Sequence, residues 1–330
     1  MSTLLEERSV GPLACGTQPR HAPLRIAVII PCHNEETTIA AVVQGFLKHL
    51  PNAAIYVCDN NSVDQSKALA REAGALVVSE PLQGKGHVVR RMFADVEADV
   101  YVLVDGDNTY DPGAAPVMVQ MLLRDRLDMV TGARDAVAQS AYRTGHRLGN
   151  VLLTGLVTAI FGNRVSDVLS GYRVFSRRFV KSLPALATGF ETETEFTVHA
   201  LELHMPIAEL PIKYDERPPG SVSKLRTISD GLRIVLMISM LIKEQRPAYF
   251  FGAFGSLFLL AAFALGIPLL LEFKHTGLVP RFPTAILATG LVLISFISFG
   301  CGVILDSVAR GRKEVKRLAY LAVSALPDNW

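Results

Sequence analysis

The sequence predicts an α/β fold in which helices cover both faces of a mainly parallel sheet, followed by an interfacial helix and a two-helix transmembrane hairpin. Short apolar runs alternate with helical patterns between residues 25 and 132, as expected for βαβ units. The apolar residues are unevenly distributed, and their excess lies after residue 225, where two stretches run without a charged residue. Together these observations predict a globular domain followed by membrane helices.

The elements of the α/β domain are expected in alternating order. The predicted strands are residues 25–30, 54–58, 75–79, 100–104 and 128–131. Between them lie predicted helices at residues 36–49, 63–73, 86–96 and 112–124. Sheets of this kind bind ligands at the carboxyl ends of their strands. The loops at those ends are polar and charged, so we expect the functional site there.

Two stretches near the C-terminal end, residues 248–271 and 284–305, contain no charged side chain. Each exceeds the ~20 residues that a helix needs to cross a hydrocarbon core. Buried core helices are the alternative, which the short loop between the two stretches disfavours. Basic residues are fewer in that loop than in the following tail, which contains Arg310, Arg312, Lys313, Lys316 and Arg317. This asymmetry predicts a multi-pass protein of the inner (cytoplasmic) membrane, with its tail and its α/β domain in the cytoplasm.

The segment before the hairpin predicts an amphipathic helix. Apolar residues recur there at spacings of three and four, namely Leu225, Ile228, Leu232, Val235, Ile238 and Ile242. Such a helix lies at a membrane surface or packs on the soluble domain, and both alternatives stay open. The chain is therefore predicted to have five parts. They are a flexible N-terminal tail (1–24), the α/β domain (25–224), the amphipathic helix (225–246), the transmembrane hairpin (247–306) and a basic tail (307–330).

The charge balance excludes one class of partner. The chain has 33 lysine and arginine residues against 31 acidic residues, so it does not have the basic excess of a nucleic-acid-binding protein. Its cysteines are expected to be reduced thiols, because they follow neither a metal-binding nor a disulfide spacing.

One predicted strand leads directly into Asp105-Gly106-Asp107. Acids two positions apart just past a strand end can converge on one hard cation. Mg²⁺ and Mn²⁺ prefer oxygen ligands and share their coordination shell with phosphates. The motif therefore predicts Asp105 and Asp107 as ligands of Mg²⁺ or Mn²⁺ bound to a diphosphate. The alternative is an acidic surface turn that caps the helix beginning near Pro112.

Other polar loops follow neighbouring predicted strands. Residues 31–36 read Pro-Cys-His-Asn-Glu-Glu, and residues 59–64 read Asp-Asn-Asn-Ser-Val-Asp. In the loop Gln83-Gly-Lys85-Gly-His, glycines let the backbone approach a phosphate and the lysine adds positive charge. The loop does not have the upstream glycine and following Ser or Thr of a Walker A motif. Helix capping is the alternative for the first loop, and one loop can serve both roles. A plain turn is the alternative for the last.

Taken in this order, the loops resemble those of family-2 glycosyltransferases with the GT-A fold, a Rossmann-like architecture. More narrowly, the chain looks like polyprenyl-phosphate glycosyltransferases, the group of dolichyl-phosphate mannose synthases and bacterial undecaprenyl-phosphate glucosyltransferases. The resemblance runs from about residue 25 to residue 224, and the hairpin matches the bacterial members. Further motifs carry it in the second half of this region: Thr131-Gly-Ala-Arg134, Val165-Ser-Asp167, Ser170-Gly-Tyr-Arg173 and Gly189-Phe-Glu191-Thr-Glu193.

The resemblance implies a nucleotide-sugar donor site at the first loops. The implied donor-binding residues are Pro31, Asn34, Glu35, Asp59, Lys85, Asp105, Asp107, Glu191 and Glu193. Among them, Asp59 would meet the base, and Glu191 and Glu193 would lie near the transferred sugar. The chain departs from the family at Asn60, where a second acid is usual, and at Thr109, where relatives often carry glutamine.

The resemblance also implies an acceptor site for the phosphate of a polyprenyl lipid. The implied phosphate-binding residues are Arg134, Arg143, Arg147, Arg217 and Lys224. Asp167 would lie in the sugar and acceptor region, and the implied catalytic residues are Asp107, Asp167 and Arg134. A solvated basic face is the alternative for the helix arginines, and a lysine reaching out to the membrane surface is the alternative for Lys224.

The implied reaction is inverting transfer of a hexose from a UDP- or GDP-sugar to a polyprenyl phosphate on the cytoplasmic face of the membrane. A processive polysaccharide synthase of the same fold is one alternative. It would carry a Gln-x-x-Arg-Trp motif, but Trp330 at the terminus is the sole tryptophan. A non-catalytic, membrane-anchored nucleotide-binding module is the other. The sugar and the choice of UDP or GDP stay open, and a homo-oligomer is compatible with the sequence.

Overall fold

The structure is a computed structural model. It describes residues 24–134, 165–189, 191–215 and 242–325, together with residues 154, 155, 158 and 240. The expected N-terminal tail, most of the expected interfacial helix and the far C-terminal residues lie outside the described residues. The same is true of four predicted phosphate-binding residues, Arg143, Arg147, Arg217 and Lys224.

The sheet of the α/β domain is mainly parallel, as predicted. Its strand order is β3-β2-β1-β4-β6-β5-β7. β6 runs antiparallel to β4 and β5, whereas the other neighbours pair in parallel. Its strands are β1 (Ile26–Cys32), β2 (Ala54–Asp59), β3 (Leu76–Ser79), β4 (Val100–Leu103), β5 (Met129–Arg134), β6 (Arg173–Ser176) and β7 (Ile207–Ile212). The expected strand positions are confirmed, and β6 and β7 extend the sheet.

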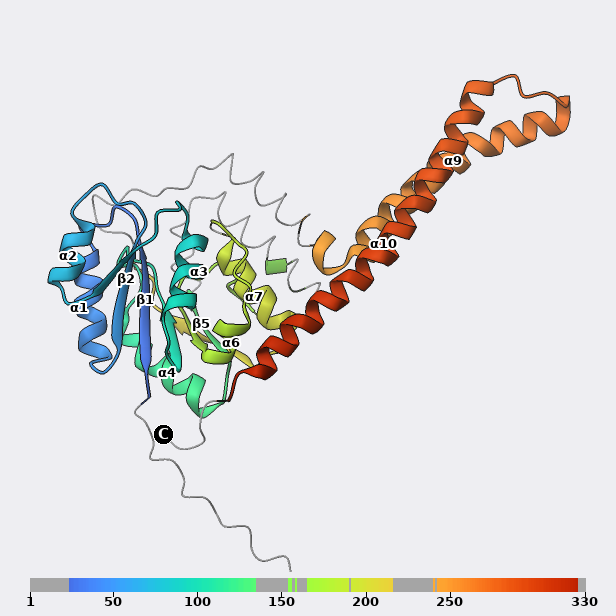
Figure 1. The fold of residues 1–330 in the computed structure, drawn as a ribbon. Coiled ribbons are helices and arrows are strands. Elements are labelled where there is room, and N and C mark those ends of the chain that lie inside the picture. Colours follow the sequence, from blue (N-terminus) through green and yellow to red (C-terminus); the bar gives the residue numbers. More distant parts are fainter. Residues whose placement is uncertain are drawn as a thin grey trace, which may run out of the picture.

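Helices cover both faces of this sheet (Figure 1). One face packs on α1 (Ile39–His49) and α4 (Ala115–Arg124), which follows the short 3₁₀ helix η1 (Pro112–Ala114). The opposite face packs on α3 (Lys85–Asp95), α6 (Arg177–Ser182) and α7 (Thr192–Glu202). The short helix α2 (Ser66–Glu72) lies beside α1. The layered arrangement is therefore the GT-A-like α/β fold that was expected.

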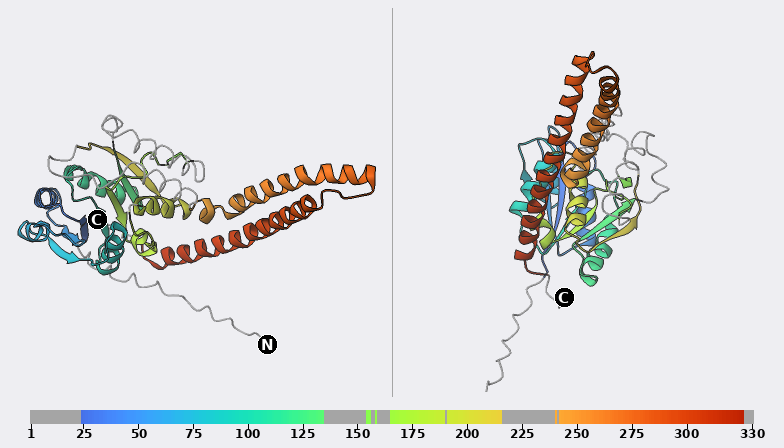
Figure 2. Two further views of the ribbon diagram at one scale, coloured as in Figure 1. Left: turned by 90° about the horizontal axis from the view of Figure 1, so that it is seen from above. Right: turned by 90° about the vertical axis from the view of Figure 1, so that its right-hand side faces the viewer.

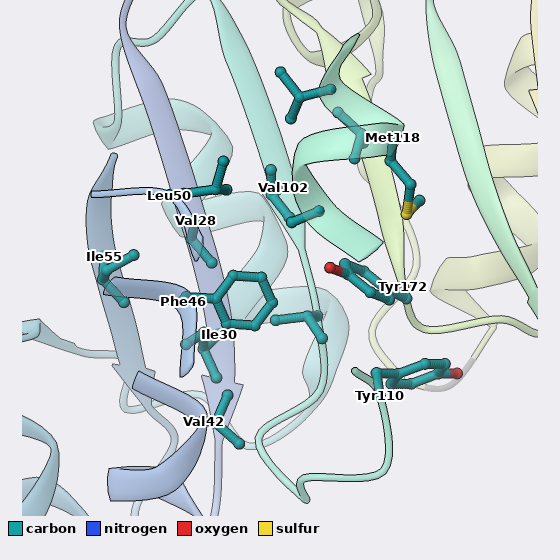
Figure 3. Packing of buried hydrophobic residues seen from close by; sticks show 14 of the residues in the cluster. Val28, Ile30, Val42, Phe46, Leu50, Ile55, Val102, Tyr110, Met118 and Tyr172 are labelled. Carbon is teal, nitrogen blue, oxygen red and sulfur yellow. The ribbon is translucent and has the colours of Figure 1, made fainter. Parts of the chain in front are cut away.

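Each face of the sheet packs on its own apolar core. Successive side chains of a strand point to opposite sides, so one strand contributes to both cores. In β1, Val28 and Ile30 belong to the core on the α1 side, whereas Ala27 and Ile29 belong to the core on the α3 side. On the α1 side, Phe46 packs edge-on against Tyr172, with ring centroids 6.1 Å apart (Figure 3). A strand buried on both faces therefore appears in the sequence as a continuous apolar run.

The hairpin consists of two long helices, α9 (Pro247–Thr276) and α10 (Phe282–Ala322). Both are long and apolar enough to cross a membrane, judged by length and composition. They lie side by side and project away from the α/β domain (Figures 1 and 2). α9 ends at Thr276 and is capped by Gly277, whose left-handed φ of 68° suits glycine. The two helices therefore have the form of a transmembrane hairpin.

α10 continues without a break beyond its apolar part, and its last turns pack on the α/β domain (Figure 1). Tyr320 donates a hydrogen bond to Asp128 at 2.9 Å, and Lys316 pairs with Glu202 at 2.8 Å. The guanidinium of Arg178 lies 5.3 Å from the centre of the Tyr320 ring. Basic residues of the expected cytoplasmic tail therefore belong to a helix that contacts α6 and α7.

Candidate active site

The polar loops named in the sequence meet at the carboxyl edge of the sheet. Residues 33–35 follow β1, residues 60–62 follow β2, and Asp105 and Asp107 follow β4. Arg134 is the last residue of β5. Because these strands run in the same direction, their ends share one edge, and side chains far apart in the sequence come together there.

The Asp105-Gly106-Asp107 turn is fixed by hydrogen bonds on both sides. The Thr38 hydroxyl at the start of α1 donates to the Gly106 carbonyl at 2.7 Å. On the other side, Oδ1 of Asp107 accepts hydrogen bonds from the Thr109 hydroxyl at 2.6 Å and from its amide at 3.2 Å. Thr109 stands where glutamine was expected from the resemblance, and its side chain orients Asp107. The buried Asp107 carboxylate therefore has a defined direction.

Lys85 connects two of the predicted donor-binding acids. Its Nζ lies 2.5 Å from Oδ1 of Asp105 and 2.5 Å from Oε1 of Glu193, the second residue of α7. Burial lowers the pKa of Lys85, but the two carboxylates more than offset burial and raise it. The ammonium is therefore charged, and it neutralises one of two carboxylates that would otherwise repel each other.

Gly171 closes the other side of Asp105. A Cβ at this position would lie 2.1 Å from Oδ2 of Asp105, so the approach requires glycine. The Gly171 amide donates to the Tyr110 hydroxyl at 3.0 Å. The segment that carries Asp167 is thereby packed directly against the Asp105 carboxylate.

Arg134 and Asp167 form a buried ion pair at the end of β5. Nε and Nη2 of Arg134 donate to the two oxygens of Asp167, each at 2.7 Å. The Asp167 side chain is 1% exposed and that of Arg134 is 10% exposed. Such a bidentate pair fixes the plane of the guanidinium. The structure therefore brings two of the three predicted catalytic residues into contact.

The loops after β1 and β2 are bonded to each other. Oδ1 of Asn34 accepts from the Val63 amide at 2.9 Å, and the Asn34 amide donates to the Ser62 hydroxyl at 3.0 Å. Asp59 is 5% exposed, and its Oδ1 accepts from the Ser62 amide at 3.3 Å. The glutamate after Asn34 donates its own amide to Ser66 at 2.7 Å. These predicted donor-binding residues form one structural unit.

Asn60 shows why an amide replaces the usual acid. Its Nδ2 donates to the carbonyls of Glu80 at 2.9 Å and Leu82 at 2.7 Å. Its Oδ1 accepts from the Gly84 amide at 2.7 Å. An ionised carboxylate cannot donate a hydrogen bond and would repel both carbonyls. Asn60 thus holds the loop that leads to Lys85.

Glu191 holds its own loop in the structure. Oε1 accepts from the amides of Thr188 and Gly189, each at 3.0 Å. Burial raises the pKa of Glu191, but these backbone hydrogen bonds outweigh burial and lower it. The same loop covers the glycines beside Lys85, since a Cβ at Gly84 would lie 2.2 Å from the Thr188 carbonyl oxygen. Close backbone packing therefore requires a glycine here independently of any phosphate.

With this geometry, the family can be assigned from comparisons with known proteins. The family description "Glycosyl transferase family 2" matches residues 27–183. The glycosyltransferase AglJ of Haloferax volcanii is 31% identical over 307 residues, which cover 91% of this chain and 99% of AglJ. The chain belongs to glycosyl transferase family 2.

Two further known proteins are similar to this glycosyltransferase. A dolichyl-phosphate hexose transferase of Haloferax volcanii is 28% identical over 222 residues, covering 67% of this chain and 95% of that protein. A crystal structure of glucosyl-3-phosphoglycerate synthase from Mycobacterium tuberculosis with Mn²⁺, UDP-glucose and phosphoglyceric acid has a TM-score of 0.54 and 26% identity. That match covers 67% of this chain and 79% of the synthase.

The carboxylates of Asp105 and Asp107 fit a divalent cation that also binds oxygen atoms from outside the protein. Asp105 and Asp107 supply two carboxylates from one turn. Within the described ranges, no group of three or more His, Cys, Asp or Glu side chains could enclose a metal by itself. A cation held by the two aspartates therefore needs further oxygen ligands from phosphate or water, as Mg²⁺ commonly does in phosphate-binding enzymes.

Sequence reasoning assigned no role to several residues that build this site. Arg173 is fully buried and donates to the carbonyls of Ser170 at 3.0 Å and Val168 at 2.6 Å. Burial lowers the pKa of Arg173 to about 10, so the side chain stays charged near neutral pH. Glu209 binds the Ser166 amide at 2.9 Å. Arg173 was visible in the Ser-Gly-Tyr-Arg motif, whereas Glu209 had no local signal.

Proposed function

We propose that this glycosyltransferase moves a hexose from a UDP- or GDP-sugar to a polyprenyl phosphate, with inversion at the anomeric carbon. One observation carries the proposal. The Asp105-Gly106-Asp107 turn after β4 and the buried Arg134 at the end of β5 lie at the same edge of the sheet. The acids suit a metal–diphosphate, and the arginine suits an acceptor phosphate. The similarity to a dolichyl-phosphate hexose transferase supports this acceptor class. The similarity to a synthase solved with UDP-glucose supports the donor class.

We assign Asp105 and Asp107 as ligands of Mg²⁺ or Mn²⁺. Such an ion supplies positive charge to the departing nucleoside diphosphate. Thr109 orients Asp107 for this role, and Lys85 holds Asp105 in place. Glu193, through Lys85, belongs to the same group of charges, near the transferred sugar. Pro31, Asn34, Glu35 and Asp59 form the nucleotide side of the site.

The acceptor phosphate is already anionic near neutral pH, so a strong general base is unnecessary. The protein must instead bring the phosphate oxygen into line with the anomeric carbon. We assign the phosphate to Arg134, together with Arg143, Arg147, Arg217 and Lys224. Asp167 keeps Arg134 in a fixed plane through two hydrogen bonds. In this proposal Asp167 contributes by orientation.

We further propose that α9 and α10 cross the cytoplasmic membrane with the α/β domain on the cytoplasmic side. A lipid acceptor requires the site to work at a membrane surface. Two helices long and apolar enough to cross are present in the same chain. The basic residues near the end of α10 favour that side.

The decisive experiment uses purified protein, undecaprenyl phosphate and a panel of UDP- and GDP-hexoses with Mg²⁺ or Mn²⁺. We expect one donor to give a lipid-linked monosaccharide of the corresponding mass. Asp107→Asn, which keeps an oxygen for the Thr109 hydrogen bond, should remove turnover without loss of helical signal. An oligosaccharide ladder would favour a processive synthase. Nucleotide binding without turnover for the whole panel would favour a binding module.

A further inference from the structure

Tyr214 contacts both Arg134 and Tyr110, which follows the Asp105-Gly106-Asp107 turn. It follows β7, and its backbone forms an antiparallel bridge with Tyr110, just beyond the acidic turn. The next amide, of Asp215, donates to the Thr109 carbonyl at 2.9 Å. Thr109 is the residue that orients Asp107. The segment after β7 is therefore bonded through its backbone to the acidic turn.

The ring of Tyr214 makes the second connection. Its centroid lies 5.1 Å from that of Tyr110, with the ring planes at 72°. The guanidinium carbon of Arg134 lies 5.6 Å from the same Tyr214 centroid. An edge-to-face aromatic pair and a cation–π contact therefore share one half-buried ring. Through this ring, Arg134 contacts the residues that follow the proposed metal ligands.

We propose that Tyr214 is a positioning residue that sets the place of the Arg134 guanidinium relative to the acidic turn. Asp167 fixes the guanidinium from one direction, and the Tyr214 ring supports it from another. The separation between these groups determines where an acceptor phosphate lies relative to the leaving diphosphate. Small errors in this separation are costly for an in-line displacement. The inference rests on the proposed function for its kinetic consequence.

The kinetic test compares Tyr214→Leu, which removes the ring, with Tyr214→Phe, which retains it. We expect Tyr214→Leu to raise the KM for undecaprenyl phosphate or lower kcat by ~3- to 30-fold, the range of a cation–π contact. Tyr214→Phe should restore near-native values. Because the Asp215–Thr109 bond is made by the backbone, the KM for the nucleotide sugar should change little. Lys213→Met, on an exposed side chain of the same segment, is the matched control.

Two kinetic results would overturn the inference. One is native kinetics in Tyr214→Leu, and the other is failure of Tyr214→Phe to restore a lost activity. A larger effect on the nucleotide-sugar KM than on the acceptor KM would also contradict it, because the ring would then serve the donor side.

A second arm requires no substrate and separates this inference from the proposed function. Thermal unfolding is measured for Arg134→Met, Tyr214→Leu and the double variant of the full chain. We expect the double variant to lose less stability than the sum of the two single losses, because both changes remove one shared contact. Additive losses would refute contact between ring and guanidinium. Coupling without any lipid-linked product would leave Tyr214 supporting Arg134 and would refute only the acceptor assignment.

Discussion

The acidic side chains of the active site are each held by a specific neighbour. Asp105 is held by Lys85, Asp107 by Thr109 and Asp167 by Arg134. A carboxylate removed from water without such partners would be costly. The sequence revealed these acids by their position after apolar runs. It did not reveal that Lys85 connects Asp105 to Glu193, because Lys85 and Glu193 are 108 positions apart.

The contribution of Lys85 can be measured with Lys85→Met. This change leaves the Asp105 and Glu193 carboxylates facing each other without a cation. We expect the free energy of unfolding to fall by ~3–5 kcal/mol, as when one partner of a buried ion pair is removed. Chemical unfolding of the detergent-solubilised chain, followed by circular dichroism, gives this value. The Lys85→Met/Glu193→Gln double variant should regain part of the loss.

The matched control for Lys85 is Arg91→Met on the same helix, where the ion pair with Asp95 is solvent-exposed. Exposed pairs contribute little, so this variant should unfold near the native midpoint. Equal losses in Lys85→Met and Arg91→Met would show that the buried pairing has no special role.

The lowered pKa of His199 predicts how the free energy of unfolding depends on pH. It lies in the core, where burial, followed by the charge of Lys316, lowers the pKa of the imidazole to about 3. Because this folded-state pKa lies below the ordinary 6.5, its stabilising contribution is present above pH 6.5 and is lost as the pH falls toward 3. Between pH 6.5 and pH 5 the loss amounts to ~2 kcal/mol.

The measurement for His199 compares unfolding at pH 7 and pH 5 in the native chain and in His199→Gln. The glutamine amide can still bond Ser182, which lies 3.0 Å from Nε2 of His199, but it does not titrate. The difference between the two pH values should therefore shrink in the variant. An unchanged difference would assign the acid sensitivity to other groups.

Among the elements, the central strands and their helices were predictable because they are long apolar or periodic runs. β6 was not, since it has four residues and begins with Arg173, a residue type that is rarely buried. The expected helix at residues 36–49 begins only at Ile39. Residues 36–38 form a turn instead, which the Glu35 carbonyl closes by accepting from the Ile39 amide while Asp64 accepts from the Glu36 amide. Contacts between residues far apart in the sequence thus determine element bounds that the local sequence pattern does not predict.

The attachment of α10 to the α/β domain is testable at Tyr320. Tyr320→Ala removes the hydrogen bond to Asp128 and the ring between the guanidinium groups of Arg178 and Arg317. We expect the last turns of α10 to be cleaved several-fold faster by trypsin in the detergent-solubilised protein. Leu321→Ala, at a neighbouring exposed side chain, is the control. Cleavage at the native rate in Tyr320→Ala would show that these contacts do not hold the helix.

For the molecule as a whole, α10 is a single helix that runs from its apolar part to the α/β domain. Its 41 residues span ~60 Å, about twice the thickness of a hydrocarbon core. One half suffices to cross, and the other half extends to the domain. Because the end of α10 contacts α6, the domain and that end must lie on the same side of the membrane. If both helices cross, the turn between α9 and α10 lies on the opposite side.

This topology is testable with single cysteines in a chain whose own cysteines are replaced. A cysteine at Thr276, in the last turn of α9, should react with an impermeant reagent in intact cells. A cysteine at Ser324, just after α10, should react only after the membrane is opened. The reverse pattern would place the α/β domain outside, and labelling of neither site in intact cells would argue against an exposed hairpin turn.

The contacts of α10 also impose an order on biosynthesis. The ribosome completes the α/β domain before the hairpin, because synthesis starts at the N terminus. Lys316 is translated 114 residues after its partner Glu202, and Tyr320 is translated 192 residues after its partner Asp128. Until those residues emerge, neither acid has its partner from α10, although Asp128 can already accept from the Ser176 hydroxyl. The domain therefore reaches its final packing only after both helices of the hairpin have been translated.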